Sequence, residues 1–217
     1  EKSGPRENLF LVADGMGGHR AGDYASRFLI QHLVACVRTS DGKAPVSVLE
    51  KAIRQVNREL YREAVEKEEL MGMGTTLVAA TTEGKTLYVS NIGDSRLYLI
   101  RRKKAYQVTR DHSYVEEMVA AGRMVRGSQE YLSQKNIITR AAGMTERVEA
   151  DFFEVDLEDG DKILLCSDGL TNMVDNEKIA EIASAGESLR RRVQRLVDQA
   201  NENGGRDNIT VILADYQ

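Results

Sequence analysis

The hydrophobic period changes along the chain, and this change restricts the possible fold more than any other feature. Residues 22–38 and 46–68 repeat apolar side chains at helical spacing, as with Leu29, Leu33 and Val37. The period then becomes that of β-strands. Four segments joined by short turns predict an antiparallel meander: residues 74–82, 85–92, 95–101 and 104–109.

The remaining segments predict helices and strands in groups, not in strict alternation. The expected strands are residues 8–13, 148–155, 161–166 and 208–214, and the expected helices are 113–122, 175–185 and 187–202. Strand runs between helix pairs favour an α+β fold over βαβ units. We therefore expect one domain, residues 1–217, with two packed antiparallel β-sheets flanked by helices on both sides.

Composition narrows the classes of function. Hydrophobic residues make up 41% of the 217, and the net charge of −4 gives no reason to expect nucleic acid as a partner. No apolar run approaches the roughly 20 residues of a membrane span, so no membrane partner is expected. Cys36 and Cys166 lie in apolar segments, which predicts reduced core thiols and a cytoplasmic protein.

Three aspartates occupy similar positions at the ends of predicted strands. Asp14 lies in "LFLVADGMGG", Asp168 in "ILLCSDGL" and Asp207 in "GGRDNITVIL". One Asp-Gly step usually marks a turn, but three at strand ends can project into a shared crevice. The adjacent glycines, such as Gly15, would let the backbone turn and its carbonyl approach a ligand. Oxygen-only ligands select Mg²⁺ or Mn²⁺.

Two further aspartates have structural interpretations as well as functional ones. Asp94 in "GDSR" is expected inside a tight hairpin, where a turn role is sufficient. Asp111 in "TRDHS" lies where a strand ends and a helix begins, so spacing alone favours an N-cap. Residues 123–136 are polar and lack apolar periodicity, which predicts a mobile loop.

Seven motifs, in order from about Leu9 to Leu213, resemble the metal-dependent protein serine/threonine phosphatases of type 2C. They are "DGMGGH", "GTTLVAA", "NIGDSRLYLIR", "VTRDHS", "NIITRAAG", "LLCSDGL" and "GGRDNITVIL". Met16 is similar to the bacterial branch, since members outside bacteria often carry a histidine there, thought to act as an acid. The resemblance implies a sandwich of two antiparallel sheets with helices outside each, and a metal cleft at one edge.

The same resemblance implies roles for individual residues. Asp14 would bridge two Mg²⁺ or Mn²⁺ ions, the Gly15 carbonyl would be a ligand, and Asp168 and Asp207 would complete the ligand shell of the second ion. Asp111, with Asp168, would hold a third ion. Residues 113–136 match the flap beside the cleft, a segment tied to substrate choice. A metal-activated water would hydrolyse phosphoserine or phosphothreonine in proteins, with no covalent phosphoenzyme. The implied partners are substrates of a Ser/Thr kinase and the kinase itself.

The start of the chain departs from the family pattern. Family members begin with a strand that carries a phosphate-binding arginine and an acidic motif, tens of residues upstream of the first Asp-Gly. Arg6 and Glu7 lie too close to Asp14 to be those residues. The expectation is a catalytic domain that lacks its N-terminal strand and first acidic motif.

Two alternatives remain open at this point. The chain could be a catalytically impaired pseudophosphatase that binds a phosphoprotein or kinase. A phosphohydrolase that forms an aspartyl-phosphate is disfavoured, because its D-x-D-x-T motif is absent after Asp14. Ser167 and Cys166, beside Asp168, are expected to be structural, since no arginine follows Cys166 at the spacing of a cysteine phosphatase loop.

Overall fold

Two four-stranded antiparallel sheets pack face to face in the computed structural model, which describes residues 8–41 and 44–217. Arg6 and Glu7 lie outside the described residues. The first sheet has the spatial order β1 (Phe10–Val12), β4 (Leu77–Glu83), β5 (Thr86–Ile92) and β8 (Asp151–Asp156). The second has the order β10 (Val211–Asp215), β9 (Lys162–Cys166), β6 (Arg96–Arg101) and β7 (Lys104–Gln107). A small third sheet pairs β2 (Gly15–Met16) with β3 (Gly74–Thr75).

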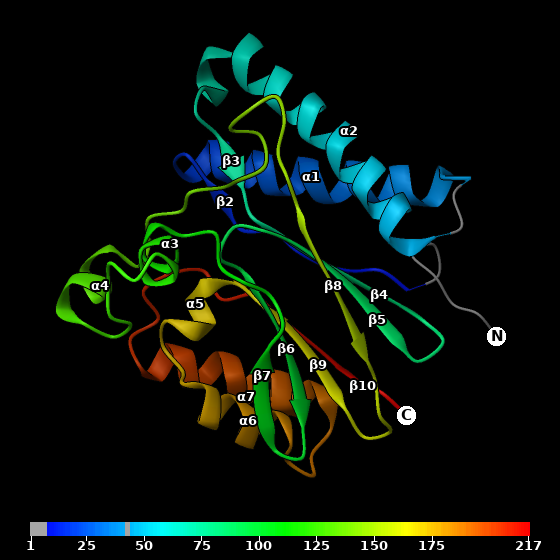
Figure 1. Cartoon of the computed structure of the whole chain (residues 1–217), viewed down its shortest axis with the longest axis vertical. Coiled ribbons are helices and arrows are strands. Elements are labelled where there is room, and N and C mark those ends of the chain that lie inside the picture. The colour runs from blue at the N-terminus through cyan, green and yellow to red at the C-terminus, as the bar shows by residue number, and fades with distance from the viewer. Residues whose placement is uncertain (1–7, 42–43) are drawn as a thin grey trace.

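Helices cover the outer face of each large sheet, which confirms the predicted α+β sandwich (Figure 1). The first sheet is covered by α1 (His19–Thr39) and α2 (Pro45–Glu66), and a 3₁₀ turn, η1 (Glu68–Leu70), follows α2. The second sheet is covered by α6 (Asn176–Ala183) and α7 (Leu189–Glu202). Within the described residues, no helix is long and apolar enough to cross a membrane.

The alternation of side chains along each strand separates three hydrophobic cores. On β4, Leu77 and Ala79 pack against α1 and α2, whereas Val78 and Ala80 pack between the two sheets. Successive strand residues point to opposite faces, and here both faces are buried, so all four side chains are apolar. This arrangement explains why the strands read as nearly continuous apolar runs.

The predicted meander is wrong at its centre, because β5 and β6 belong to different sheets. The chain leaves the first sheet after Ile92 and enters the second at Arg96. Gly93 has a φ of 95°. Its N–H donates to Nδ1 of His112 at 3.1 Å, and its carbonyl accepts from the main-chain N–H of His112 at 2.9 Å. The Gly-Asp-Ser turn is therefore a crossover and not a hairpin. Both need a glycine with positive φ, so local sequence does not distinguish them.

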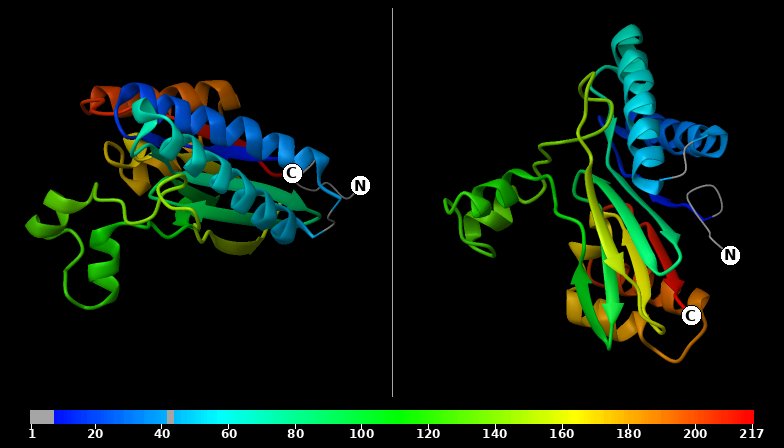
Figure 2. Two further views of the ribbon diagram at one scale, coloured as in Figure 1. Left: turned by 90° about the horizontal axis from the view of Figure 1, so that it is seen from above. Right: turned by 45° about the vertical axis from the view of Figure 1, so that its right-hand side comes forward.

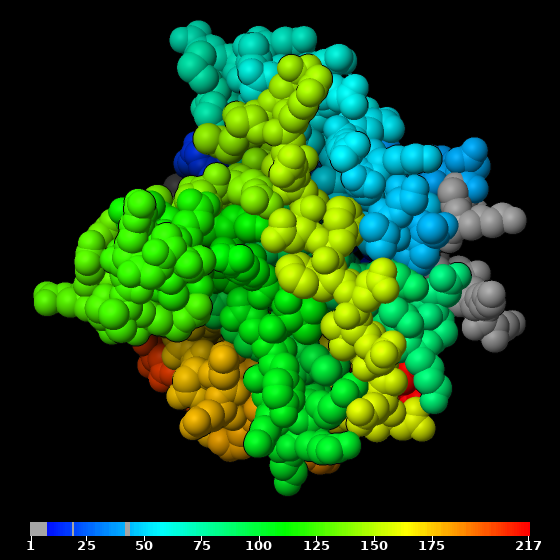
Figure 3. All heavy atoms as spheres, viewed as in Figure 1, coloured from blue at the N-terminus to red at the C-terminus, as the bar shows by residue number. Residues whose placement is uncertain are grey.

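The segment 123–136, predicted as an irregular loop, contains a short helix. After α3 (Tyr114–Ala120), the chain forms α4 (Gln129–Gln134), and the Ser128 hydroxyl caps it by accepting from the N–H of Tyr131. Tyr131 also donates its hydroxyl to Glu116 on α3 at 2.6 Å. Together α3 and α4 form a lobe that stands out from the sandwich (Figures 2 and 3). The mobility of this lobe stays a prediction.

A buried arginine connects the helices over the second sheet to its edge strand. Arg192 on α7 is 4% exposed, and its guanidinium donates to the carbonyl of Ala183 at 2.7 Å and to both carboxylate oxygens of Asp215 on β10. This ion pair lowers the pKa of Asp215. The interaction therefore joins α6, α7 and β10 at one point.

We expect Arg192→Met to lower the free energy of unfolding by about 2–3 kcal/mol, because it leaves Asp215 and the Ala183 carbonyl without their partner. Since pairing lowers the pKa of Asp215, the loss should be complete above about pH 5 and shrink as the pH falls below about 4. Urea unfolding at several pH values measures both effects. Arg191→Met, at an exposed neighbouring position, is the control. Equal stability of the two variants at pH 7 would contradict this role for Arg192.

Candidate functional site

Asp14 follows β1, and its main chain is fixed to the segment before β4. Its N–H donates to the hydroxyl of Thr76 at 2.9 Å. Its carbonyl accepts from the N–H of Thr76 at 2.9 Å and from the hydroxyl of Thr75 at 3.0 Å. Burial, and then repulsion from Asp168 and Asp207, raise the pKa of Asp14 to about 6. The three predicted aspartates therefore lie close enough to interact electrostatically.

Close contacts between backbones bring these aspartates together. A Cβ on Gly15 would lie 1.9 Å from the carbonyl oxygen of Gly22 on α1. A Cβ on Gly169 would lie 2.2 Å from the carbonyl oxygen of Asn208. Neither glycine has a positive φ, so the expected sharp turn is not the reason for glycine here. The reason is that no side chain fits between the touching backbones. A ligand role for the Gly15 carbonyl stays a prediction.

Asp168 begins a short helix, α5 (Asp168–Thr171), directly after β9. Its Oδ2 accepts from the side-chain amide of Asn172 at 2.8 Å, and the Asn172 amide oxygen accepts from Lys135 Nζ at 2.7 Å. Burial and repulsion from Asp207 raise the pKa of Asp168. Lys135 follows α4, so a chain of hydrogen bonds connects the α3–α4 lobe to Asp168.

Ser167 positions the segment that carries Asp207. Its hydroxyl donates to the carbonyl of Asn208 at 3.0 Å and accepts from the N–H of Thr210 at 3.0 Å. Asp207 is exposed, and its Oδ1 accepts from the N–H of Asn208 at 2.7 Å. Neighbouring Cys166 is fully buried, and burial raises the pKa of its thiol to about 12. Both residues therefore act as structural elements of the site.

Asp111 is held by an arginine and a glutamine. Arg96 donates to both of its carboxylate oxygens, with Nη2 to Oδ2 at 2.7 Å, and Gln107 donates to Oδ1 at 2.8 Å. The N-cap of α3 is Ser113, so Asp111 does not cap that helix. A carboxylate in a two-pronged pair with arginine is already neutralised. This pairing argues against the expected role of Asp111 as ligand of a third ion.

Asp94 lies in the crossover between the sheets, and sequence reasoning assigned it only to a turn. It is 7% exposed, and its pKa is raised to about 7 by burial, by repulsion from Asp168 and Asp111, and more weakly by Asp14. Asp94 and Asp168 line one cavity of about 170 Å³. Asp14 and Asp207 line a larger hollow of about 430 Å³. A burial signal was present in the sequence, since apolar strands flank the "GDSR" turn.

The donor set fits hard divalent cations. Asp14, Asp94, Asp168 and Asp207 offer only oxygen, the donor type that Mg²⁺ and Mn²⁺ select. Burial, and then repulsion from neighbouring carboxylates, raise the pKa values of Asp14, Asp94 and Asp168, and a bound cation would offset both effects. Among the described residues, no three acidic, histidine or cysteine side chains already enclose a single ion position. The carboxylates instead line two cavities, one with Asp14 and Asp207 and one with Asp94 and Asp168, which suits cations that retain water ligands.

Comparisons with known proteins show the family of this chain. A family model described as "Protein phosphatase 2C" matches residues 2–214. The serine/threonine phosphatase stp of Listeria innocua is 39% identical over 214 residues, covering 97% of this chain and 85% of the relative. The structure of the S. agalactiae serine/threonine phosphatase has a TM-score of 0.90 at 35% identity, covering 96% of this chain and 87% of that one.

A third relative was solved with metal present. It is the catalytic domain of the serine/threonine protein phosphatase PstP in complex with two manganese ions. It has a TM-score of 0.84 at 35% identity, covering 95% of this chain and 86% of that one. With the acidic site at the edge of two packed sheets, these matches show that the chain belongs to the bacterial protein phosphatase 2C family and is a protein serine/threonine phosphatase.

Proposed function

We propose that this protein hydrolyses phosphoserine and phosphothreonine in proteins with Mg²⁺ or Mn²⁺ bound by Asp14, Asp168 and Asp207, and by the carbonyl of Gly15. The observation that carries the proposal is the convergence of Asp14, Asp168 and Asp207, where burial, and then repulsion from the other two, raise the pKa of Asp14 to about 6. The two manganese ions of the PstP structure support the same assignment. Bound cations would supply Lewis-acid activation of water and of the phosphoryl group.

The surrounding residues orient the ligands. Asn172 donates to Asp168 and fixes the direction of one carboxylate oxygen, so the other stays available to a cation. The main chain of Asp14 is held by Thr75 and Thr76. Oδ2 of Asp168 and Oδ1 of Asp207 already accept hydrogen bonds, from Asn172 and from the N–H of Asn208, and the second oxygen of each carboxylate stays available to a cation.

A further cation would bind between Asp94 and Asp168, and not at Asp111. Asp94 and Asp168 repel each other, which favours a cation between them. Asp111 serves instead to hold Arg96, which also donates to the hydroxyl of Tyr98 at 3.0 Å. This replaces the third-ion assignment made from the sequence.

The partners we propose are proteins phosphorylated by a Ser/Thr kinase, and the kinase itself, in the cytoplasm. The names of the relatives support phosphoproteins as the substrate class. The pseudophosphatase alternative is not favoured, because Asp14, Asp168 and Asp207 are all present and electrostatically coupled.

The first test is phosphate release from a phosphothreonine peptide with Mn²⁺. We expect the protein to be active and Asp168→Asn to reduce turnover by at least about 100-fold, because losing even an outer-shell partner of a metal ligand costs 10–100-fold. Circular dichroism should show an intact fold. Wild-type turnover in Asp168→Asn would reject the assigned metal site, and an inactive wild type would favour the pseudophosphatase.

The backbone contact at Gly169 should be essential to the geometry of the site. Gly169→Ala places a methyl group against the carbonyl of Asn208, so we expect a loss of about 1–3 kcal/mol in unfolding free energy and reduced Mn²⁺-dependent turnover. Gly186→Ala is the matched control, because no atom lies within 4 Å of its added Cβ. Urea unfolding and peptide kinetics on both variants measure the difference. Two variants that behave alike would show that this contact does not set the geometry.

The two further aspartates should respond differently to neutralisation. We expect Asp94→Asn to raise the Mn²⁺ concentration for half-maximal turnover by about tenfold. Asp111→Asn should instead lower the unfolding free energy by about 2–3 kcal/mol, because it leaves Arg96 with a weaker partner. Metal titrations and urea unfolding of both variants test this. A metal shift in Asp111→Asn alone would restore the original assignment.

A further inference from the structure

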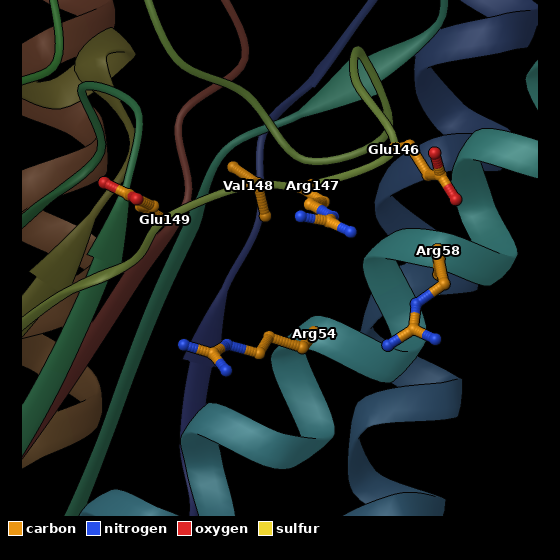
Figure 4. Close-up of a pocket in the computed structure, with 6 residues that line it drawn as sticks. All are labelled: Arg54, Arg58, Glu146, Arg147, Val148 and Glu149. Carbon is orange, nitrogen blue, oxygen red and sulfur yellow. The ribbon is translucent and has the colours of Figure 1, made fainter.

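A groove of about 460 Å³ lies between α2 and the segment 146–149, outside the aspartate site (Figure 4). One wall is formed by Arg54 and Arg58 of α2, and the other by residues 146–149, which include buried Val148. None of the residues that line it is among the aspartates of the proposed metal site.

The two walls are joined by a buried side chain. Asn57, 1% exposed, donates its amide to the carbonyls of Thr145 at 3.0 Å and Glu146 at 3.1 Å, and accepts from the N–H of Gly143 at 2.8 Å. Gly143 has a φ of 87° and packs against Leu60 on α2. Asn57 thus satisfies three main-chain groups of the facing segment. The groove is therefore a built feature of the fold and not a chance gap between loops.

Three guanidinium groups surround the groove. Figure 4 shows Arg54, Arg58 and Arg147 around it, while the carboxylates of Glu146 and Glu149 point away. Arg54 is paired with Glu50 at 2.6 Å. Within the described part of the chain, Arg58 and Arg147 form no ion pair. Two exposed arginines directed at one groove favour carboxylate or phosphate oxygens as partners.

Positive charge continues along the same face of α2. Lys51 and Arg62 line an adjoining hollow with Arg54 and Arg58, and Glu59 there accepts from Gln55 at 3.0 Å. From Lys51 to Arg62 the helix rises about 16 Å, at 1.5 Å a residue. An extended peptide of about five residues covers that length, and a single phosphate does not.

We propose that this groove, lined by Arg54, Arg58 and Arg147, binds an acidic stretch of the phosphoprotein substrate. The proposal rests on the proposed function and names a feature of its substrates. The segment that forms the groove also reaches the metal site, since Ala142 pairs with Thr75, which bonds to the carbonyl of Asp14. Arg147 is five residues beyond Ala142, so at most about 18 Å separates their Cα atoms. The proposal requires one substrate chain to occupy both sites at once.

The test compares two phosphothreonine peptides of equal length, with Mn²⁺ present. One carries five glutamates starting about six residues from the phosphothreonine, and the other carries glutamines. We expect wild type to show the lower KM for the acidic peptide. Arg58→Gln/Arg147→Gln should raise that KM about three- to tenfold with kcat unchanged, because exposed charge pairs contribute modestly. KM for the glutamine peptide and hydrolysis of a small aryl phosphate should not change.

Arg190→Gln/Arg191→Gln is the matched control, because it removes the same charge from exposed positions on α7. The proposal is overturned if the control raises KM as much as the groove variant, or if wild type does not distinguish the peptides. Groove-dependent binding to phosphatidylserine vesicles without peptide preference would also overturn it, in favour of a membrane surface. Fluorescence anisotropy with the unphosphorylated acidic peptide tests the groove without turnover. Failure of the groove proposal is thereby distinguishable from failure of the phosphatase activity, because hydrolysis of the aryl phosphate measures that activity separately.

Discussion

Burial of aspartates that repel one another is the constraint around which the site is organised. Asp14 and Asp94 have pKa values raised to about 6 and 7 because each is buried and faces other carboxylates. Groups that repel each other stay close only when the backbone holds them there. The protein does this with main-chain contacts. Gly15 touches Gly22, and Gly169 touches Asn208, with no room for a Cβ. The scaffold thus fixes the charges in place before any cation arrives.

The cationic side chains near the repelling carboxylates are bonded to other residues and not to Asp168 itself. Arg96 is occupied by Asp111, and Lys135 contacts Asn172, which in turn bonds to Asp168. Direct pairing of either cation with Asp168 would neutralise the charge that the proposed metal site requires. Through Asn172, the lobe of α3 and α4 is still connected to Asp168 by hydrogen bonds. The lobe is therefore connected to the site by hydrogen bonds as well as by lying next to it.

Local patterns in the sequence were sufficient for the layers of the fold but not for the connection between them. The continuous apolar run from Leu77 to Ala80 indicates a strand that is buried on both faces. The helical spacing of Leu29 and Leu33 indicates a helix that is buried on one face. The crossover after Gly93 depends on His112, nineteen residues later, which no local pattern reveals. Likewise, α4 is polar and only six residues long. A hydrogen bond from its tyrosine to α3 supports it, and periodicity does not indicate such a contact.

The candidate site was predictable only in part for the same reason. Asp14, Asp168 and Asp207 each follow or precede a strong strand, so their placement at a sheet edge follows from sequence. Whether Asp94 or Asp111 faces them depends on Arg96, whose two-pronged pairing with Asp111 is visible only in three dimensions. The glycines were singled out from the sequence, but the expected sharp turn is not the reason for them, because close backbone contact leaves the same signature in sequence as a turn.

The aspartates do not all belong to one sheet, and this has a thermodynamic consequence. Asp14 follows a strand of the first sheet, whereas Asp168 and Asp207 flank strands of the second. A cation shared among them would cross-link the two halves of the sandwich from the outside. Ligand binding of this kind adds to folding stability in proportion to the logarithm of free ion concentration over its dissociation constant. The free metal concentration in the cell would then set the folding stability of the protein as well as its rate of turnover.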